Sequence, residues 1–449
     1  MNARELSRRT GWLIGVLLLG TFGCGDDTEP QSPDCSDPQG QPVAVELHTT
    51  AASQFLGTRP ANVTWVAMQD ASCAWQRVEG TQGQYDFTVK SGRYGVAVAC
   101  SGPDANGDPN NWLSIFYLTP SEGTALQVQC FQPLPDSTPT HLLSLNLEES
   151  FPLEVRYWLH EQSEAVTLEG GAERLDFRAA SGIHDVAAGS FQNGTLQRFQ
   201  LWRDLDSGAD NAVDIDVNDP GWITPGSIQV NTERKQGEMV TLDASYLTTH
   251  RTRIGLGAGL DNTGTAGAVS FQTPLVPAAN RSGDEIHHFG VQATSGFLTR
   301  EADTYLKDPG SALDLVLPDG STGAGVSCVS ASGCTIRFNV MPGAAAYGVR
   351  YLSTATPGTL QQIFITASAA YQGSAATLTF PDFSGVPGWN PSWGPVPSGS
   401  AWFVSTIGNN RGFAGELAAT NDGHEEQPLA ALDGITRWMV EEGVVASGS

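Results

Sequence analysis

Positively charged residues are scarce in this 449-residue sequence, which has 23 lysines and arginines against 48 aspartates and glutamates. Only three of the positive residues are lysines: Lys90, Lys235 and Lys307. The formal net charge of −25 attracts cations and repels nucleic-acid phosphates and anionic lipid headgroups. We therefore exclude nucleic acid as a binding partner.

Long apolar segments are also lacking, and no stretch after residue 24 is long and apolar enough to form a membrane helix. The apolar run Trp12–Phe22 is too short to span a bilayer. Gly23 follows this run, and three arginines precede it: Arg4, Arg8 and Arg9. Because this order of basic, apolar and small residues is typical of a secretory signal, we predict that residues 1–23 are a signal peptide.

Sequence motifs of common catalytic sites are missing as well. The chain has no HExxH, no G-x-S-x-G, no Walker sequence and no CxxC. His287 and His288 are adjacent, and neighbouring residues of a strand point to opposite faces, so they do not predict a shared metal ion. We predict that the protein is not an enzyme. The alternative is an extracytoplasmic hydrolase whose carboxylate site has no linear motif.

The segment Thr21-Phe22-Gly23-Cys24 resembles the lipobox of bacterial lipoproteins. The resemblance implies that Cys24 is the first residue of the mature chain, carries a diacylglycerol, and anchors the protein in the cell envelope, with the outer membrane as the expected location. Thr21 departs from the family, which usually has leucine there, and secretion without a lipid is the alternative. The acidic, proline-containing residues 24–40 are predicted to be a flexible tether.

An even number of cysteines remains once Cys24 is assigned to the lipid, and outside the cytoplasm such cysteines indicate disulfides. They are Cys35, Cys73, Cys100, Cys130, Cys328 and Cys334. Cys328 and Cys334 flank a short turn-like loop, which favours their pairing. Period-two alternation places Cys100 and Cys130 on apolar strand faces, so we favour that pair, which leaves Cys35 with Cys73. The other pairings of these four cysteines stay open.

Apolar residues alternate with period two, and helical periodicity is nearly absent. Tyr85–Val89 and Tyr94–Cys100 read as two strands joined by a glycine-containing turn. The chain is also rich in turn residues, with 51 glycines and 26 prolines. These features predict an all-β fold made of tandem, independently folding antiparallel β-sandwich modules of the immunoglobulin or fibronectin III-like kind.

An internal repeat supports this interpretation. With a shift of 90 residues, Val63–Ala97 aligns without a gap on Leu153–Ala187, with eight identities in 35 positions. The identities lie at predicted turns and at inward-facing strand positions, as in Asp86-Phe87 and Asp176-Phe177. A period of 90 suits a sandwich of about seven strands. We therefore place modules at residues 41–131 and 141–254, the second a repeat of the first, separated by the proline-rich segment 132–140.

A second boundary is predicted in the glycine-rich run 255–267, followed by a β segment at 268–319 and a further module at 320–449. In this last module, residues 338–344 (FNVMPGA) and 347–351 (YGVRY) resemble fibronectin type III-like domains. The resemblance covers residues 325–415 and implies a strand, a Pro-Gly-Ala turn and a strand that carries a tyrosine. Phe338 stands where such domains commonly have tryptophan. As a whole, the chain resembles multidomain bacterial lipoproteins, a likeness that implies no activity.

Closely spaced acidic residues suggest one cofactor, a structural Ca²⁺ bound by Asp204, Asp206 and Asp210, because Ca²⁺ takes six to eight oxygen ligands. The alternative is a strand at Val213–Val217 with its aspartates turned to solvent. A second segment, 104–110 (DANGDPN), has suitable oxygens, but Pro109 replaces the glycine that such a loop needs.

Two tryptophans near the C-terminal end, Trp389 and Trp393, lie in a proline- and glycine-rich loop. Exposed tryptophans in such a loop stack on sugar faces or anchor a protein partner, whereas buried ones pack between modules. The sequence therefore predicts a lipid-anchored, non-catalytic envelope protein that displays β-sandwich modules for adhesion, recognition or envelope assembly. A carbohydrate-binding protein is a further alternative.

Overall fold

The computed structural model describes residues 40–53, 57–70, 74–103, 109–131, 140–149, 153–159, 162–168, 171–180, 182–192, 194–206, 215–216, 221–320, 323–328, 333–353, 359–396, 400–420 and 428–448. The predicted all-β fold is confirmed, because β-strands arranged as packed sheets dominate these residues. No helix within these ranges combines the length and the apolar character needed to cross a membrane. The predicted signal peptide and almost all of the predicted tether lie outside the described residues.

The first unit, module 1 (residues 43–131), is a sandwich of two sheets. One sheet has the order β4-β3-β6-β7, and the other contains β2, β1 and β5 with β8 parallel to β1. Its strands are β1 (Val43–Ser53), β2 (Gly57–Pro60), β3 (Trp65–Asp70), β4 (Gln76–Arg77), β5 (Gln84–Val89), β6 (Tyr94–Pro103), β7 (Pro109–Leu118) and β8 (Ala125–Phe131).

Module 2 (residues 140–216) has the same strand order. Its sheets run β11-β10-β13-β14 and β12-β9-β15, again with the last strand parallel to the first. The strands are β9 (Thr140–Glu149), β10 (Leu153–Leu159), β11 (Gln162–Leu168), β12 (Gly171–Ala180), β13 (Ile183–Gln192), β14 (Thr195–Asp206) and β15 (Ile215–Asp216). The 90-residue shift places β3 on β10 and β6 on β13, so the sequence repeat corresponds to a repeated topology.

Module 3 (residues 226–320) is a third copy of this topology, which the sequence did not indicate. Its sheets run β18-β17-β20-β21 and β19-β16-β22, with β22 parallel to β16. The strands are β16 (Gly226–Arg234), β17 (Met239–Leu247), β18 (Arg253–Asp261), β19 (Gly267–Leu275), β20 (Ile286–Ser295), β21 (Leu298–Leu306) and β22 (Ala312–Asp314), with a short 3₁₀ helix, η1 (Ala278–Asn280).

The glycine-rich run that suggested a boundary at 255–267 instead forms most of β18 and its connection to β19, inside module 3. β16 pairs with β19 from Gly226–Leu275 to Arg234–Gly267, so strands on both sides of the predicted boundary belong to one sheet. The glycines have a packing role, since a Cβ on Gly257 would lie 2.9 Å from Oγ1 of Thr273. Glycine at alternate positions of a strand marks a close approach of another chain segment rather than a linker.

Module 4 (residues 323–448) contains two sheets, β26-β25-β28-β29 and β27-β24-β23-β30. The expected Pro-Gly-Ala turn joins β24 to β25, with Gly343 at a φ of 78°. Its elements are β23 (Gly325–Cys328), β24 (Cys334–Arg337), β25 (Ala344–Ser353), β26 (Leu360–Ser368), α2 (Ala369–Gln372), β27 (Thr377–Thr379), η2 (Pro391–Trp393), β28 (Ala401–Asn409), α3 (Gly412–Thr420), η3 (Leu429–Ala431), β29 (Thr436–Val445) and β30 (Ser447–Gly448).

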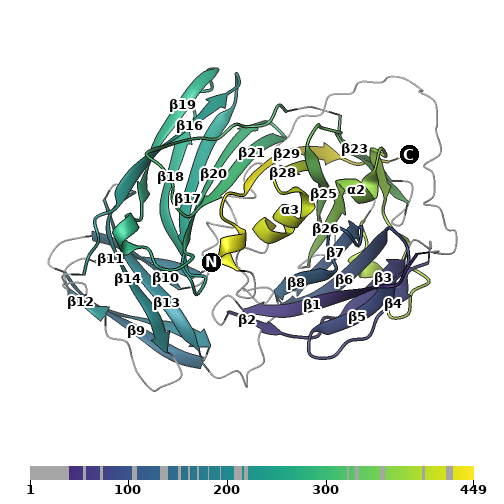
Figure 1. Cartoon of the computed structure of the whole chain (residues 1–449), viewed down its shortest axis with the longest axis horizontal. Helices are drawn as coiled ribbons and strands as arrows, with labels where there is room; N and C mark the ends of the chain where they lie inside the picture. The colour runs from purple at the N-terminus through teal and green to yellow at the C-terminus, as the bar shows by residue number, and fades with distance from the viewer. Residues whose placement is uncertain are drawn as a thin grey trace.

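Three of the modules share one twelve-stranded sheet, so the expectation of independently folding modules is wrong. The sheet runs from β18 of module 3 through module 4 to β4 of module 1. β21 pairs antiparallel with β29, and β26 pairs parallel with β7 from Leu360–Asn110 to Ala367–Tyr117. Figure 1 shows the consequence: the chain runs through modules 1, 2 and 3 and returns, so that module 4 lies against module 1.

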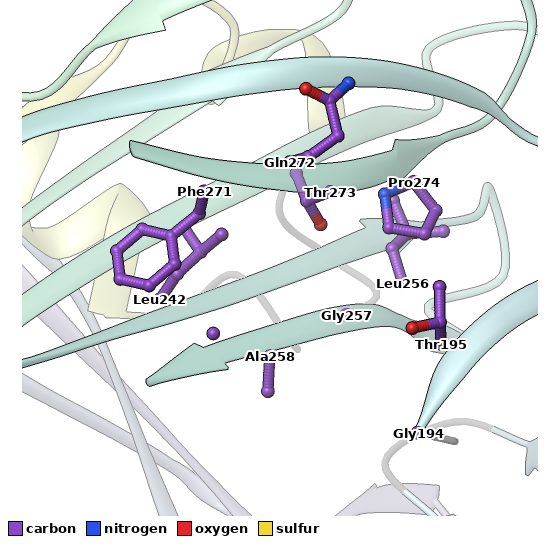
Figure 2. A pocket seen from close by; sticks show the side chains of 11 residues that line it. Gly194, Thr195, Leu242, Leu256, Gly257, Ala258, Phe271, Gln272, Thr273 and Pro274 are labelled. Atoms are coloured by element: carbon purple, nitrogen blue, oxygen red, sulfur yellow. The ribbon is translucent and has the colours of Figure 1, made fainter. Parts of the chain in front are cut away.

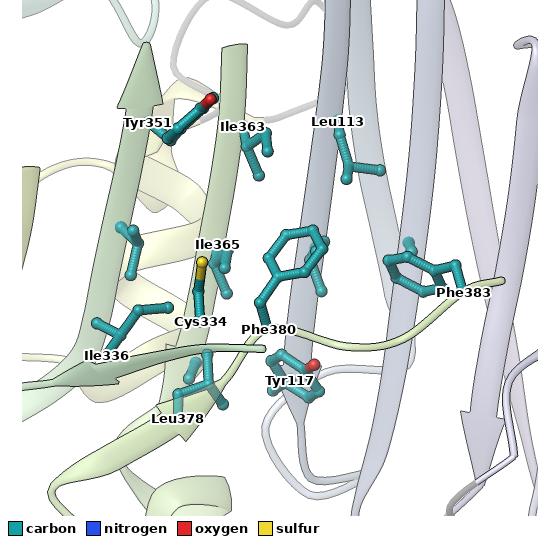
Figure 3. Close-up of a cluster of buried hydrophobic side chains, with 14 of the residues drawn as sticks. Leu113, Tyr117, Cys334, Ile336, Tyr351, Ile363, Ile365, Leu378, Phe380 and Phe383 are labelled. Carbon is teal, nitrogen blue, oxygen red and sulfur yellow. The ribbon is translucent and has the colours of Figure 1, made fainter. Parts of the chain in front are cut away.

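The hydrophobic cores also cross module boundaries. β3 is buried on both faces: Val66 belongs to the core of module 1, whereas Trp65 belongs to a core shared with module 4. In Figure 3, Leu113 and Tyr117 of β7 lie in one cluster with residues of module 4, such as Phe380. A second shared core joins modules 2 and 3. Because these strands are buried on both faces, most positions of β3 and β6 must be apolar.

Candidate functional site

The junction between modules 2 and 3 contains the described cluster of residues that best fits a metal ion. Asp185 on β13, Asp204 on β14 and His250 in the β17–β18 loop offer ligand atoms within 4.8 Å of one another. Asp185 is fully buried, and its carboxylate accepts hydrogen bonds from the backbone N–H groups of Asp204 and His250, each at 3.0 Å. Nε2 of His250 lies 3.0 Å from Oδ1 of Asp204. The cluster thus holds two modules together.

The calcium prediction stays a prediction, because only part of the predicted site is described. Asp204 is in the cluster, but Asp206 is not and is exposed at the end of β14, whereas Asp210 lies outside the described residues. Two carboxylates with an imidazole suit Zn²⁺ better than Ca²⁺, which prefers an all-oxygen shell. Both carboxylate oxygens of Asp185 already accept backbone hydrogen bonds. These bonds explain the position of Asp185 without a metal ion. In the second candidate segment, only Pro109 and Asn110 are described, and both belong to β7.

A buried carboxylate, Glu285, forms the second polar contact of this junction. Its side chain is fully buried and accepts two hydrogen bonds from Arg203 of module 2, at 2.8 and 2.7 Å. The hydroxyl of Tyr246 and the backbone N–H of Ser282 donate to it as well, each at 2.7 Å. Burial acts against the charge of Arg203, but the contacts with Glu285 outweigh it and raise the pKa of Arg203. Such a fully bonded charge pair fixes the orientation of the two modules.

The seam between modules 3 and 4 carries an excess of buried negative charge. Arg437 on β29 donates to Glu416 of α3 and to Glu301 and Asp303 of β21, at distances between 2.9 and 3.1 Å. Nε2 of His288, on β20, lies 3.2 Å from Oδ1 of Asp303. Burial, together with the nearby charge of Asp303, raises the pKa of Glu301 to about 7. Burial also opposes the ionisation of Asp303, but the hydrogen bond with His288 lowers its pKa overall.

We expect the seam to weaken as the pH rises. Because the pKa of Glu301 rises from 4.5 to about 7 on folding, its contribution to stability is complete below pH 4.5 and is lost by about pH 7 to 8. Glu301→Gln imitates the protonated side chain and should stabilise the protein at pH 8 by up to about 3 kcal/mol while changing little at pH 5. Denaturant unfolding at both pH values measures this. Glu79→Gln, at a side chain that is 79% exposed, is the control. Equal effects of Glu301→Gln at both pH values would contradict the prediction.

The two candidate tryptophans lie between modules 1 and 4. Trp393 is buried and Trp389 is half-buried, and their ring centroids lie 6.0 and 5.2 Å from that of Trp65 in module 1. Nε1 of Trp393 donates to Oγ of Ser101, and Nε1 of Trp65 donates to the carbonyl of Pro387. These side chains therefore form an inter-module contact and not an open platform for a sugar. Trp393 is not the exposed ligand-binding residue that the sequence suggested, because the shared core covers it. Trp389 is only partly buried against this core, and a ligand-binding role for it stays a prediction.

Two cysteine pairs are joined in the structure as the sequence favoured. Cys100 of β6 bonds to Cys130 of β8, with a Cα–Cα distance of 5.8 Å, and links the two sheets of module 1. Cys328 of β23 bonds to Cys334 of β24, with a Cα–Cα distance of 4.0 Å. The remaining three cysteines lie outside the described residues: Cys24, Cys35 and Cys73. Their lipid and disulfide assignments stay predictions.

A small hollow lies beside the junction of modules 2 and 3. Its volume is about 60 Å³, and its walls come from β18, β19 and the β13–β14 turn (Figure 2). Sites for substrates and cofactors usually measure about 300–1,000 Å³, so this hollow accommodates one small side chain or a few water molecules.

Comparisons with known proteins add little. No protein-family model matches the chain, and a search of the curated proteins gives no match. Among solved structures, the chain is similar to the Bacillus anthracis TIE protein, with 10% identity and a TM-score of 0.14; 61% of this chain is covered, and it spans about half (49%) of that one. It is also similar to the chicken CNTN1 FN1-FN3 domains, with 8% identity over 57% of this chain and 83% of that one and a TM-score of 0.13. TM-scores this low carry no argument about arrangement or function.

Sequence reasoning missed most members of the junction and seam clusters. Glu416 and Glu301 lie 21 and 136 residues from Arg437, so no linear motif joins them. One local signal was present, because Asp185 is a charged residue inside the apolar stretch of β13. A charge at a buried strand position requires a partner and marks a contact with another part of the fold.

Proposed function

We propose that this protein is an exported, non-catalytic recognition protein of the cell envelope, anchored by a lipid on Cys24. The observation that carries the proposal is the array of joined β-sandwich modules, whose clustered charged groups bond to one another across module boundaries. Groups engaged in this way hold the array in one shape and leave strand edges and loops for contacts with partners. The strand order of module 4 fits the fibronectin type III-like assignment made from its sequence.

The proposed membrane location is tested by cell fractionation. We expect the wild-type protein in the membrane fraction and Cys24→Ser in the soluble extracytoplasmic fraction, because removal of the acyl chains removes the anchor. Cys328→Ser is the matched control, since it alters a cysteine of module 4 and should stay with the membrane. An unchanged location of Cys24→Ser would show that the anchor is not at this residue.

The recognition role is tested against the enzyme alternative. A broad hydrolase screen of the purified protein should show no turnover, and chemical cross-linking on intact cells should capture an extracytoplasmic partner. Turnover that is abolished by replacing a carboxylate of the protein would reject the non-catalytic proposal in favour of a hydrolase.

A further inference from the structure

The twelve-stranded sheet ends at β18, which pairs with β17 and with no other described strand. The free edge of such a strand presents backbone N–H and C=O groups that can pair with another chain, and proteins usually protect it with lysine, proline or a bulge. Module 2 approaches the first half of β18, where a Cβ on Gly255 would lie 3.6 Å from Nε1 of Trp158. β18 also has a bulge at Leu256, where its pairing with β17 shifts by one residue. The second half, Gly257–Asp261, pairs regularly, has no lysine, arginine or proline, and includes Leu260, which is 62% exposed.

The 60 Å³ hollow opens beside this second half of β18 (Figure 2). Leu242 and Phe271 supply apolar walls, and the glycines of β18 leave room where side chains would otherwise stand. The hydroxyl of Thr273 is buried, has no hydrogen-bond partner within the described protein, and points between β19 and β18. The hollow thus offers one polar group and an apolar wall next to the regularly paired half of β18, whose outer edge pairs with no described strand.

We propose that an extended peptide segment of a partner protein adds to β18 as a further strand and places a small side chain, of the size of alanine, serine or valine, in this hollow. Strand addition of this kind takes affinity from backbone hydrogen bonds and specificity from pockets for alternate side chains. The remaining positions of the peptide would favour lysine or arginine, because Asp243 is exposed and lies opposite Ala258 on the neighbouring strand. The net charge of −25 also attracts a basic peptide at long range. This inference rests on the proposed recognition function and names its class of partner.

The backbone pairing is tested with a synthetic eight-residue peptide that alternates lysine and valine, with both ends blocked. Binding to the purified full-length protein is followed by isothermal titration calorimetry. Every second amide of an added strand faces its neighbour, so N-methylation of one alternate set of amides should abolish binding and N-methylation of the other set should preserve it. Equal binding of both methylated peptides, or equal loss, would show attraction to an acidic surface without strand pairing.

The location is tested with charge variants. Leu260→Lys should weaken the binding of the basic peptide by about tenfold through like-charge repulsion at the edge. Val316→Lys adds the same charge to module 3 at a side chain that is 82% exposed, and it should leave binding unchanged. Thr273→Val should remove any preference for a peptide with serine over one with valine. Equal weakening by both lysine variants would overturn the proposed site.

A second copy of the chain is the competing occupant. Self-association that depends on protein concentration and is abolished by Leu260→Lys would assign the edge to another copy and contradict the partner proposal. Binding of the peptide to the purified protein does not depend on the lipid anchor at Cys24. If the protein is in the membrane fraction but does not bind the peptide, only the inference about β18 is wrong. If Cys24→Ser stays with the membrane, the proposed anchor at Cys24 is wrong.

Discussion

Trp393→Ala should lower the stability of the paired modules 1 and 4 by about 3–5 kcal/mol, the cost of deleting a buried aromatic side chain. Trp393 is 5% exposed, packs against Trp65, and donates a hydrogen bond to Ser101 of module 1. Alanine leaves a cavity in the shared core and removes that donor. Because the side chain joins two modules, the variant should also expose the β26–β7 pairing to hydrogen exchange, which mass spectrometry can measure.

The control for this prediction is Trp222→Ala. Trp222 is half-buried, and the guanidinium of Arg198 lies 4.8 Å from the centroid of its ring. Because this ring is partly exposed, Trp222→Ala should cost clearly less than Trp393→Ala. If Trp393→Ala cost as little as Trp222→Ala, the tryptophan contact would not hold modules 1 and 4 together.

Glu285→Ala should destabilise the junction of modules 2 and 3 by a similar amount, about 3–5 kcal/mol, because it leaves buried donors without their acceptor. Arg203, Tyr246 and Ser282 all donate to this carboxylate. The paired charges themselves contribute little net stability, and the cost comes from the uncompensated guanidinium and hydroxyl. Urea unfolding, with limited proteolysis of the segment between the modules, measures the effect.

A double variant separates the effect of losing the Arg203–Glu285 ion pair from the effect of losing side-chain volume at the junction. Arg203→Met with Glu285→Leu should recover much of the stability, since an apolar pair of similar volume replaces both charges. Glu79→Ala, which breaks an exposed ion pair with Arg77, should change stability by less than about 1 kcal/mol. A double variant no more stable than Glu285→Ala would mean that the cost comes from the donors left without an acceptor, Tyr246 and Ser282, and not from the guanidinium.

Local features of the fold could be predicted where the chain's own neighbours decide them. The alternation around Tyr94–Cys100 indicated a strand, and the short loop between Cys328 and Cys334 indicated a disulfide. The repeat of residues 63–97 at 153–187 corresponds to two units of equal topology. The glycines of β18 were misread, because the sequence shows flexibility at these positions and not the approach of Phe271 and Thr273.

The amino-acid sequence by itself determined which segments are strands, where they turn, and which faces are apolar, because these depend on side-chain alternation and turn residues. Only the tertiary structure decided that β7 pairs with β26, that β21 pairs with β29, and that Trp393 is covered. Strand edges pair through backbone groups that every residue carries, so the order of strands in a sheet leaves almost no trace in the sequence. The clusters around Glu285 and Arg437 form only after that order is set, since their members come from segments far apart in the chain.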